Sequence, residues 1–114
     1  MMRIIIAVFT CFFYVSGYAV CPNALPTNDV NFCASFKDTA GCHCRELLPK
    51  GGALCNNPHL IYETMLIRYK SLQNACATQT YTSAQDCMDN WSCYLNGGVD
   101  SHGRICSSTR LACR

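Results

Sequence analysis

Residues 58–97 decide the fold of this chain, and they read PHLIYETMLIRYKSLQNACATQTYTSAQDCMDNWSCYLNG. In both halves of this stretch, apolar side chains recur at the spacing of a helix that buries one face. They are Ile61, Tyr62, Met65, Tyr69, Leu72 and Cys76 in the first half and Ala84, Cys87, Met88, Trp91, Tyr94 and Leu95 in the second. Two successive amphipathic helices predict a helical hairpin.

The second helix of this hairpin carries recognisable signals at both ends. Ser83 precedes it, and Asp86 follows three residues later, as in a capping box. Asn96-Gly97-Gly98 supplies residues that end a helix in the left-handed region. The link at residues 77–82 is short and polar, so we expect the two helices to run antiparallel. We also expect Tyr81, in this link, to be exposed.

The start of the chain has the features of a secretory signal peptide. Residues 1–3 give a basic start, residues 4–15 an apolar core, and small residues precede position 20. The apolar core is too short to span a bilayer comfortably. We therefore predict a signal peptide at residues 1–19, a single cysteine-rich domain at residues 20–114, secretion from the cell, and no membrane span after signal cleavage.

The cysteines also indicate that the protein is secreted. The chain has 11 cysteines, and Cys11 leaves with the signal peptide. An even number at this density predicts five disulfides in an oxidising environment. The predicted disulfide residues are Cys21, Cys33, Cys42, Cys44, Cys55, Cys76, Cys87, Cys93, Cys106 and Cys113.

Position on the helices suggests some of the pairs. Cys76 and Cys87 lie in facing stripes near the link, so we expect them to bond. Cys93 points about 160° away from Trp91 around its helix, which favours a partner in an N-terminal segment or in the C-terminal tail. Cys42 and Cys44 are too close in sequence to bond each other readily, so each should pair with a different neighbour.

A second helical segment precedes the hairpin. Asn28 is placed to cap it, apolar residues recur at helical spacing from Phe32 to Ala40, and Gly41 is expected to stop it. The predicted fold is therefore a small, disulfide-rich, all-α domain. It has a central antiparallel helical hairpin, a short N-terminal helix and about five disulfides.

Charge excludes some classes of partner. The chain has nine basic and seven acidic residues, and loss of Arg3 with the signal peptide leaves a net charge of +1. The basic residues form no stripe, so nucleic-acid binding and polybasic membrane docking have no support.

Chemical motifs are sparse. Cys42-His43-Cys44 has the residue types of a metal site, but in a secreted chain the disulfide reading is favoured. Ser101 and His102 are neighbours in a glycine-rich loop, which does not predict a nucleophile oriented against a base. We therefore expect no metal, no cofactor and no enzymatic activity.

The general type resembles the disulfide-rich secreted proteins of animal venoms, a resemblance of class that covers no motif. It implies a non-enzymatic binding protein, such as a venom-type toxin, with an extracellular receptor or ion channel as its protein target. The candidate binding loop is residues 96–103, and the candidate contact residues are Asp100, His102 and the adjoining Arg104. We expect alanine at these three positions to weaken binding more than folding.

Two alternatives remain open. A serine protease inhibitor would present a basic residue on a disulfide-braced loop, and Arg104 and Lys50 both lie near cysteines. Short motifs of this kind often occur by chance, so ordinary surface charge is the favoured interpretation of both residues. A carrier of small apolar ligands would instead need a cavity between the helices where the two apolar stripes meet.

Overall fold

The computed structural model describes residues 21–114, and the predicted signal peptide lies outside the described residues. Helices dominate, and five disulfides link them, which confirms the predicted fold class. The elements in chain order are α2 (Phe32–Leu47), η1 (Gly52–Asn56), α3 (Pro58–Tyr69), α4 (Leu72–Thr78), α5 (Ala84–Asn96) and η2 (Cys106–Ser108).

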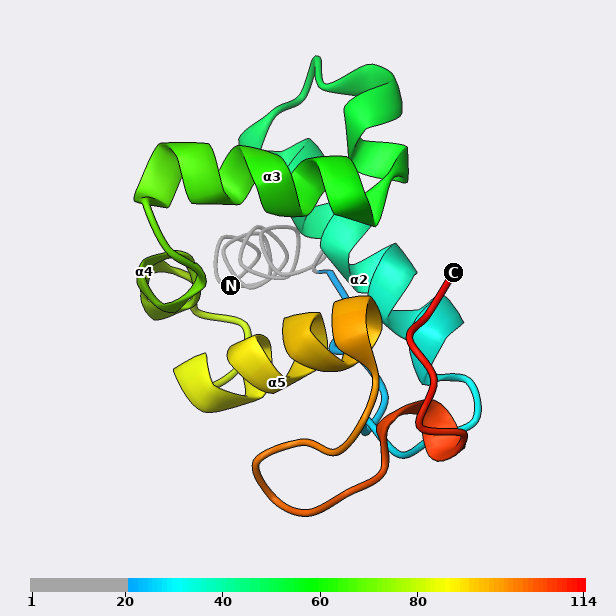
Figure 1. The fold of residues 1–114 in the computed structure, drawn as a ribbon. Helices are drawn as coiled ribbons and strands as arrows, with labels where there is room; N and C mark the ends of the chain where they lie inside the picture. The colour runs from blue at the N-terminus through cyan, green and yellow to red at the C-terminus, as the bar shows by residue number, and fades with distance from the viewer. Residues whose placement is uncertain (1–20) are drawn as a thin grey trace, which may run out of the picture.

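The helical hairpin is present, with α3 and α5 as its antiparallel arms. Figure 1 shows the two helices running in opposite directions, with α4 joining them at one end and α2 crossing them at the other. Helix α5 begins where predicted, because the Ser83 side chain accepts a hydrogen bond from the Asp86 backbone N–H (3.0 Å). It ends at Gly97, which has a positive φ of 75°.

The first predicted helix of the hairpin is divided into two helices, α3 and α4. Lys70 adopts a left-handed conformation (φ 76°) and ends α3. Ser71 then caps α4 by accepting a hydrogen bond from the Asn74 backbone N–H. The Asn74 amide reaches back to the Tyr69 carbonyl oxygen (3.0 Å) and fixes the corner. Two polar residues that can bond to the backbone therefore break the apolar stripe.

Helix α2 is also longer than predicted, and its start moves from Asn28 to an N-cap at Asn31. Gly41 does not stop it. This glycine is buried inside the helix, and a Cβ atom there would lie 3.0 Å from the Cys55 carbonyl oxygen. Gly41 therefore allows η1 to approach the helix closely.

The core forms where α2 crosses α5. Phe32, Phe36, Trp91 and Tyr94 are each at most 3% exposed. The rings of Phe36 and Trp91 meet edge to face with centroids 4.8 Å apart, an arrangement that aromatic pairs favour. Helix α2 is thus a principal core element and not an accessory to the hairpin.

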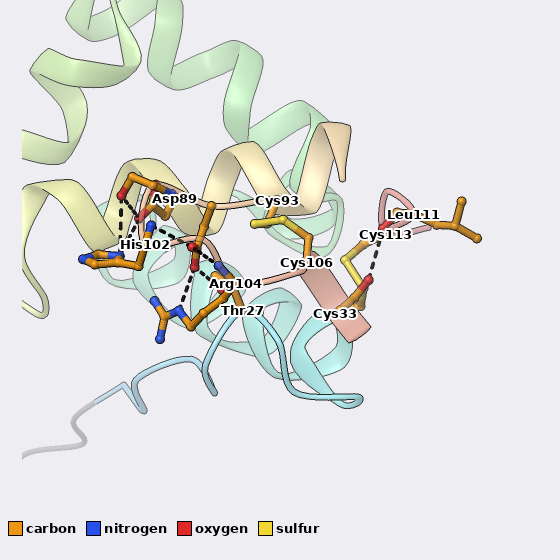
Figure 2. Close-up of a disulfide and its surroundings, with 12 residues drawn as sticks. Thr27, Cys33, Asp89, Cys93, His102, Arg104, Cys106, Leu111 and Cys113 are labelled. Carbon is orange, nitrogen blue, oxygen red and sulfur yellow. Dashed lines mark hydrogen bonds and ion pairs between the residues drawn. A yellow bond between two sulfur atoms is a disulfide. The ribbon is translucent and has the colours of Figure 1, made fainter. Parts of the chain in front are cut away.

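The disulfides join these elements to each other and to the termini. Cys76 bonds Cys87 across the α4–α5 link, as predicted, and Cys93 bonds Cys106 in the tail. Cys42 and Cys44 do take different partners, which are Cys21 and Cys55. The fifth bond, Cys33–Cys113, ties the C-terminal tail to the start of α2, and Figure 2 shows it beside Leu111.

Within residues 21–114, none of the helices combines the length and the apolar character that crossing a membrane requires.

Candidate functional site

Two regions could bind a partner: the predicted loop after α5, and a groove between the helices that the sequence did not reveal. The loop is closed at its base by an antiparallel bridge between Val99 and Ile105. The predicted contact residues Asp100, His102 and Arg104 all lie within this closed loop, but their environments differ.

Asp100 is the buried anchor of the loop. Its side chain is inaccessible to solvent and accepts four hydrogen bonds. Its Oδ1 atom accepts from the backbone N–H groups of His102 and Arg104, both at 2.9 Å. Its Oδ2 atom accepts from the Thr27 hydroxyl and from Arg104 Nε (2.8 Å). These contacts give Asp100 a structural role, and they argue against the expectation that alanine would be tolerated at this position.

These contacts also control the ionisation of Asp100. Burial alone would raise the pKa of the carboxyl group, but the hydrogen bonds from Thr27, Arg104 and His102 outweigh it and lower the pKa to about 2. The carboxylate therefore stays charged through the physiological range and keeps the loop in one conformation.

His102 is the accessible residue of the three. Its side chain is 53% exposed, and its Nδ1 atom lies 3.4 Å from Asp89 Oδ2. Ser101 also binds this carboxylate, because its hydroxyl donates to Asp89 Oδ2 at 2.7 Å. Figure 2 shows Asp89 and His102 side by side at the edge of the loop.

This arrangement of Ser101, His102 and Asp89 differs from a catalytic triad. In a triad the imidazole stands between the nucleophile and the carboxylate and uses a different nitrogen for each. Here the serine hydroxyl donates directly to the carboxylate, and the same nitrogen, His102 Nδ1, faces both groups. The contacts hold the loop against α5 and do not activate Ser101.

Among residues 21–114, two clusters bring together side chains that could ligate a metal ion. One contains Cys21, whose sulfur is already bonded to Cys42 and is not a free thiolate. The other consists of Asp86, Asp89 and His102, with ligand atoms within 4.8 Å of one another. The Asp89 carboxylate there already accepts hydrogen bonds from protein donors, so these contacts account for its burial without an ion.

The two candidate inhibitor residues occupy different settings. The Arg104 side chain is bonded to buried Asp100, so its Nε atom is turned toward the protein and not toward a protease. Lys50 is exposed in the turn that follows α2, where the Gly51 backbone N–H donates to the Leu48 carbonyl oxygen (2.8 Å). Both residues lie in segments closed by a disulfide, Arg104 between Cys93 and Cys106 and Lys50 between Cys44 and Cys55, so the inhibitor alternative stays a prediction, with Lys50 as its exposed candidate.

The second region is a groove of about 890 Å³ among α2, α3, α4 and α5. Tyr62 of α3 meets Trp91 of α5 with ring centroids 5.6 Å apart, and beyond this contact the groove separates the two arms. Ile61 and Trp91 lie at its base and are 6% and 3% exposed. Half-buried Met65, Leu48 and Leu54 extend the apolar lining.

One wall of the groove is aromatic and uncharged. His43 of α2 stacks on Tyr81 of the α4–α5 link, with ring centroids 4.0 Å apart. Burial raises the pKa of Tyr81 to about 12. Burial also lowers the pKa of His43, against an opposing effect of the nearby Glu46 carboxylate. Tyr81 is half-buried against His43, so the expectation that it is an exposed tyrosine is wrong.

Sequence reasoning missed this groove because the two apolar stripes predict a closed seam. The break at Lys70 and Ser71 turns α4 away from the line of α3, and the groove opens beside this corner. The available signal was local: Ser71 and Asn74 stand three residues apart in the middle of the predicted helix.

No family model, curated protein or solved structure matches the chain significantly.

Proposed function

We propose that this chain is a secreted, non-enzymatic binding protein that carries a small apolar ligand in the groove between α3 and α5. The observation behind this proposal is the groove itself, with a volume of about 890 Å³ and a mainly apolar lining. Pockets that bind small molecules typically occupy about 300–1,000 Å³ and are lined mostly by apolar and aromatic side chains. The groove has that size and that character.

The disulfides support this reading because they brace the walls of the groove. Cys44 and Cys87 both line it, and their bonds to Cys55 and Cys76 tie α2 to η1 and α5 to α4. Walls held in this way cannot readily collapse onto one another to fill the space. A binding site formed before the ligand arrives loses little conformational entropy on binding.

Secretion is part of the proposal. Five disulfides within residues 21–114 fit an oxidising compartment, and the predicted signal peptide at residues 1–19 would direct the chain there. An extracellular carrier of this kind would keep a poorly soluble molecule dispersed in an aqueous fluid.

The test is a titration with a neutral apolar fluorophore, N-phenyl-1-naphthylamine, on the oxidised protein. We expect saturable binding to the wild type and weaker binding to Thr64→Phe, which adds a ring to the lining of the groove. Ile67→Phe is the matched control, because this residue of α3 is 76% exposed and does not line the groove.

Equal binding by the wild type and by both variants would place the fluorophore outside the groove. No saturable binding to the wild type would remove the carrier proposal altogether.

A receptor- or channel-binding protein of venom-toxin type is the second candidate, and the loop at residues 99–105 favours it. Buried Asp100 holds the backbone of this loop, while the His102 side chain stays 53% exposed. A rigid loop with an accessible side chain suits recognition of a protein. His102→Ala should then abolish target binding in a cell-based assay without changing secretion, whereas unchanged binding would exclude the loop.

A further inference from the structure

We infer that the groove takes an anionic amphiphile, such as a long-chain carboxylate, with its apolar tail along α3 and its headgroup at Arg68. This inference rests on the proposed carrier function and deepens it by naming the class of ligand.

Arg68 is the permanent cation among the residues that line the groove. It lies in the last turn of α3 and is exposed, and its guanidinium carbon is 5.9 Å from the centre of the Tyr69 ring. Among residues 21–114, no carboxylate lies within ion-pair distance of it. Arg104, by contrast, is paired with Asp100 at 2.8 Å. The positive charge at the groove is thus unmatched within the described part of the chain.

Three neutral polar side chains of the lining, Thr64, Thr78 and Gln79, are already engaged, whereas the buried His43 Nε2 atom has no hydrogen-bond partner within residues 21–114. The Thr64 hydroxyl donates to the Leu60 carbonyl oxygen, and the Thr78 hydroxyl donates to the Ala75 carbonyl oxygen, both at 2.8 Å. The Gln79 side-chain amide donates two hydrogen bonds and accepts two more within the link that follows α4. These groups have little left to offer a ligand. Among residues 21–114, the guanidinium of Arg68 contacts the Tyr69 ring and makes no hydrogen bond.

Glu46, the carboxylate of the lining, contacts His43 and not Arg68. Glu46 of α2 lies 3.5 Å from His43 Nδ1, and its side chain is 53% exposed. It forms no ion pair with Arg68. An incoming anion therefore does not have to displace a carboxylate from the guanidinium.

The apolar side chains that precede Arg68 on α3 would contact the tail of the ligand. Met65 and Ile61 precede Arg68 on the same side of α3, and all three line the groove. The distance along the helix from Arg68 to Ile61 is about 10 Å, at about 1.5 Å per residue. Trp91 of α5 also lines the groove, and both Ile61 and Trp91 are buried. This order, from a cation to a buried apolar base, matches an amphiphile with a charged head and one alkyl tail.

The guanidinium group suits a carboxylate in particular. It can donate two parallel N–H bonds to the two oxygens of a carboxylate, whereas a hydroxyl headgroup offers a single uncharged oxygen and a quaternary ammonium group accepts no hydrogen bond. Partly exposed ion pairs contribute up to about 1 kcal/mol, which corresponds to about a five-fold change in affinity.

The experiment compares three ligands with the same tail, sodium dodecanoate and dodecyltrimethylammonium below their micelle concentrations and dodecanol below its solubility limit. Trp91 is the single tryptophan of the chain and lines the groove, so its emission reports occupancy. We expect the wild type to bind dodecanoate about five-fold more tightly than dodecanol, and the cationic ligand more weakly than either.

Arg68→Gln should lower the affinity for dodecanoate to that for dodecanol and leave dodecanol unchanged, while Arg68→Lys should keep part of the preference. Lys70→Gln is the matched control: it removes the same charge two residues away, at a position that does not line the groove. It should keep the preference.

Equal affinity of the wild type for dodecanoate and dodecanol would overturn the headgroup assignment and leave the carrier proposal standing. The headgroup assignment would also be overturned if Arg68→Gln kept the preference for dodecanoate over dodecanol. It would be overturned as well if Lys70→Gln lost that preference to the same extent as Arg68→Gln. If none of the three ligands changes the emission of Trp91 or binds by calorimetry, the carrier proposal fails and the headgroup assignment fails with it.

Discussion

Asp100 lies in a loop, yet the fold depends on its charge. Its carboxylate holds Thr27 near the start of the domain against the loop after α5, so it joins segments 73 residues apart in sequence. The same carboxylate fixes the backbone of His102 and Arg104. Loops of this kind are usually tolerant of substitution, and Asp100 departs from that rule because it is buried and fully hydrogen-bonded.

The pKa of Asp100 makes this contribution dependent on pH. The folded-state pKa is about 2, below the ordinary value of 3.8. A carboxyl group whose pKa is lowered by folding stabilises the protein above its unfolded-state pKa and loses that effect as the pH falls toward the folded-state value. The shift corresponds to about 2 kcal/mol, lost between about pH 4 and pH 2.

We therefore expect Asp100→Asn to lower the free energy of unfolding at pH 7 and to flatten its decline between pH 4 and pH 2. Urea unfolding of the oxidised protein measures both effects. Asp38→Asn is the control, since Asp38 is exposed on α2. Identical pH profiles for the wild type and Asp100→Asn would show that the Asp100 carboxylate is not specifically stabilised.

Trp91 is central both to the core and to the groove. It is 3% exposed and contacts Phe36 and Tyr62. Trp91→Ala should cost about 3–5 kcal/mol of unfolding free energy, the usual range for loss of a buried large aromatic side chain. Near-native thermal stability of this variant would place Trp91 on the surface.

At the scale of the elements, the break between α3 and α4 has a direct test. Lys70 has a left-handed backbone, which costs an ordinary residue about 1 kcal/mol and costs glycine almost nothing. Lys70→Gly should therefore raise the free energy of unfolding by up to about 1 kcal/mol. In a continuous helix the same change would lower it by about 1 kcal/mol, so the sign of the effect distinguishes the two structures.

Helix α2 and η1 approach each other through Gly41, and a larger residue there should separate them. Gly41→Val would place atoms against the Cys55 carbonyl oxygen and should cost about 1–3 kcal/mol. Ala34→Val, at an exposed position of the same helix, measures the cost of a β-branched side chain on its own, whereas loss of a glycine should in itself favour the helix at position 41. An unfolding free energy of Gly41→Val equal to or above that of the wild type would mean that Gly41 has no packing role.

These elements also show what the sequence can predict. The start of α5 depends on Ser83 and Asp86, which lie three residues apart, and such local signals can be read directly. The roles of Gly41 and Asp100, by contrast, could not be predicted from the neighbouring sequence. A glycine near the end of an apolar run has the pattern of a helix stop, and an aspartate among glycines has that of a surface loop. Their actual roles depend on Cys55 and Thr27, which only the folded chain brings near.

At the scale of the whole molecule, the five disulfides account for all ten cysteines of the described chain. We expect secreted material to contain no free thiol, as measured by thiol titration of the denatured, unreduced protein. Peptide mapping should find Cys76 with Cys87 and Cys33 with Cys113. One reactive thiol per chain would contradict this pairing.

The groove is likewise a property of the whole molecule, because four helices and three disulfides define it. Sequence patterns show which faces are apolar, but not whether two such faces close on each other. The corner at Lys70 and the crossing of α2 decide that they do not, and neither is visible in the periodicity of residues 58–97.

The most direct test of the carrier proposal is a ¹H–¹⁵N NMR titration of the oxidised protein with dodecanol. The single indole N–H, from Trp91, gives one resolved signal within the groove. We predict that this signal shifts saturably, together with the backbone signals of Ile61 and Met65, while those of the loop at residues 99–105 stay in place. Saturable shifts confined to that loop, or no shift of the Trp91 indole, would contradict the proposal.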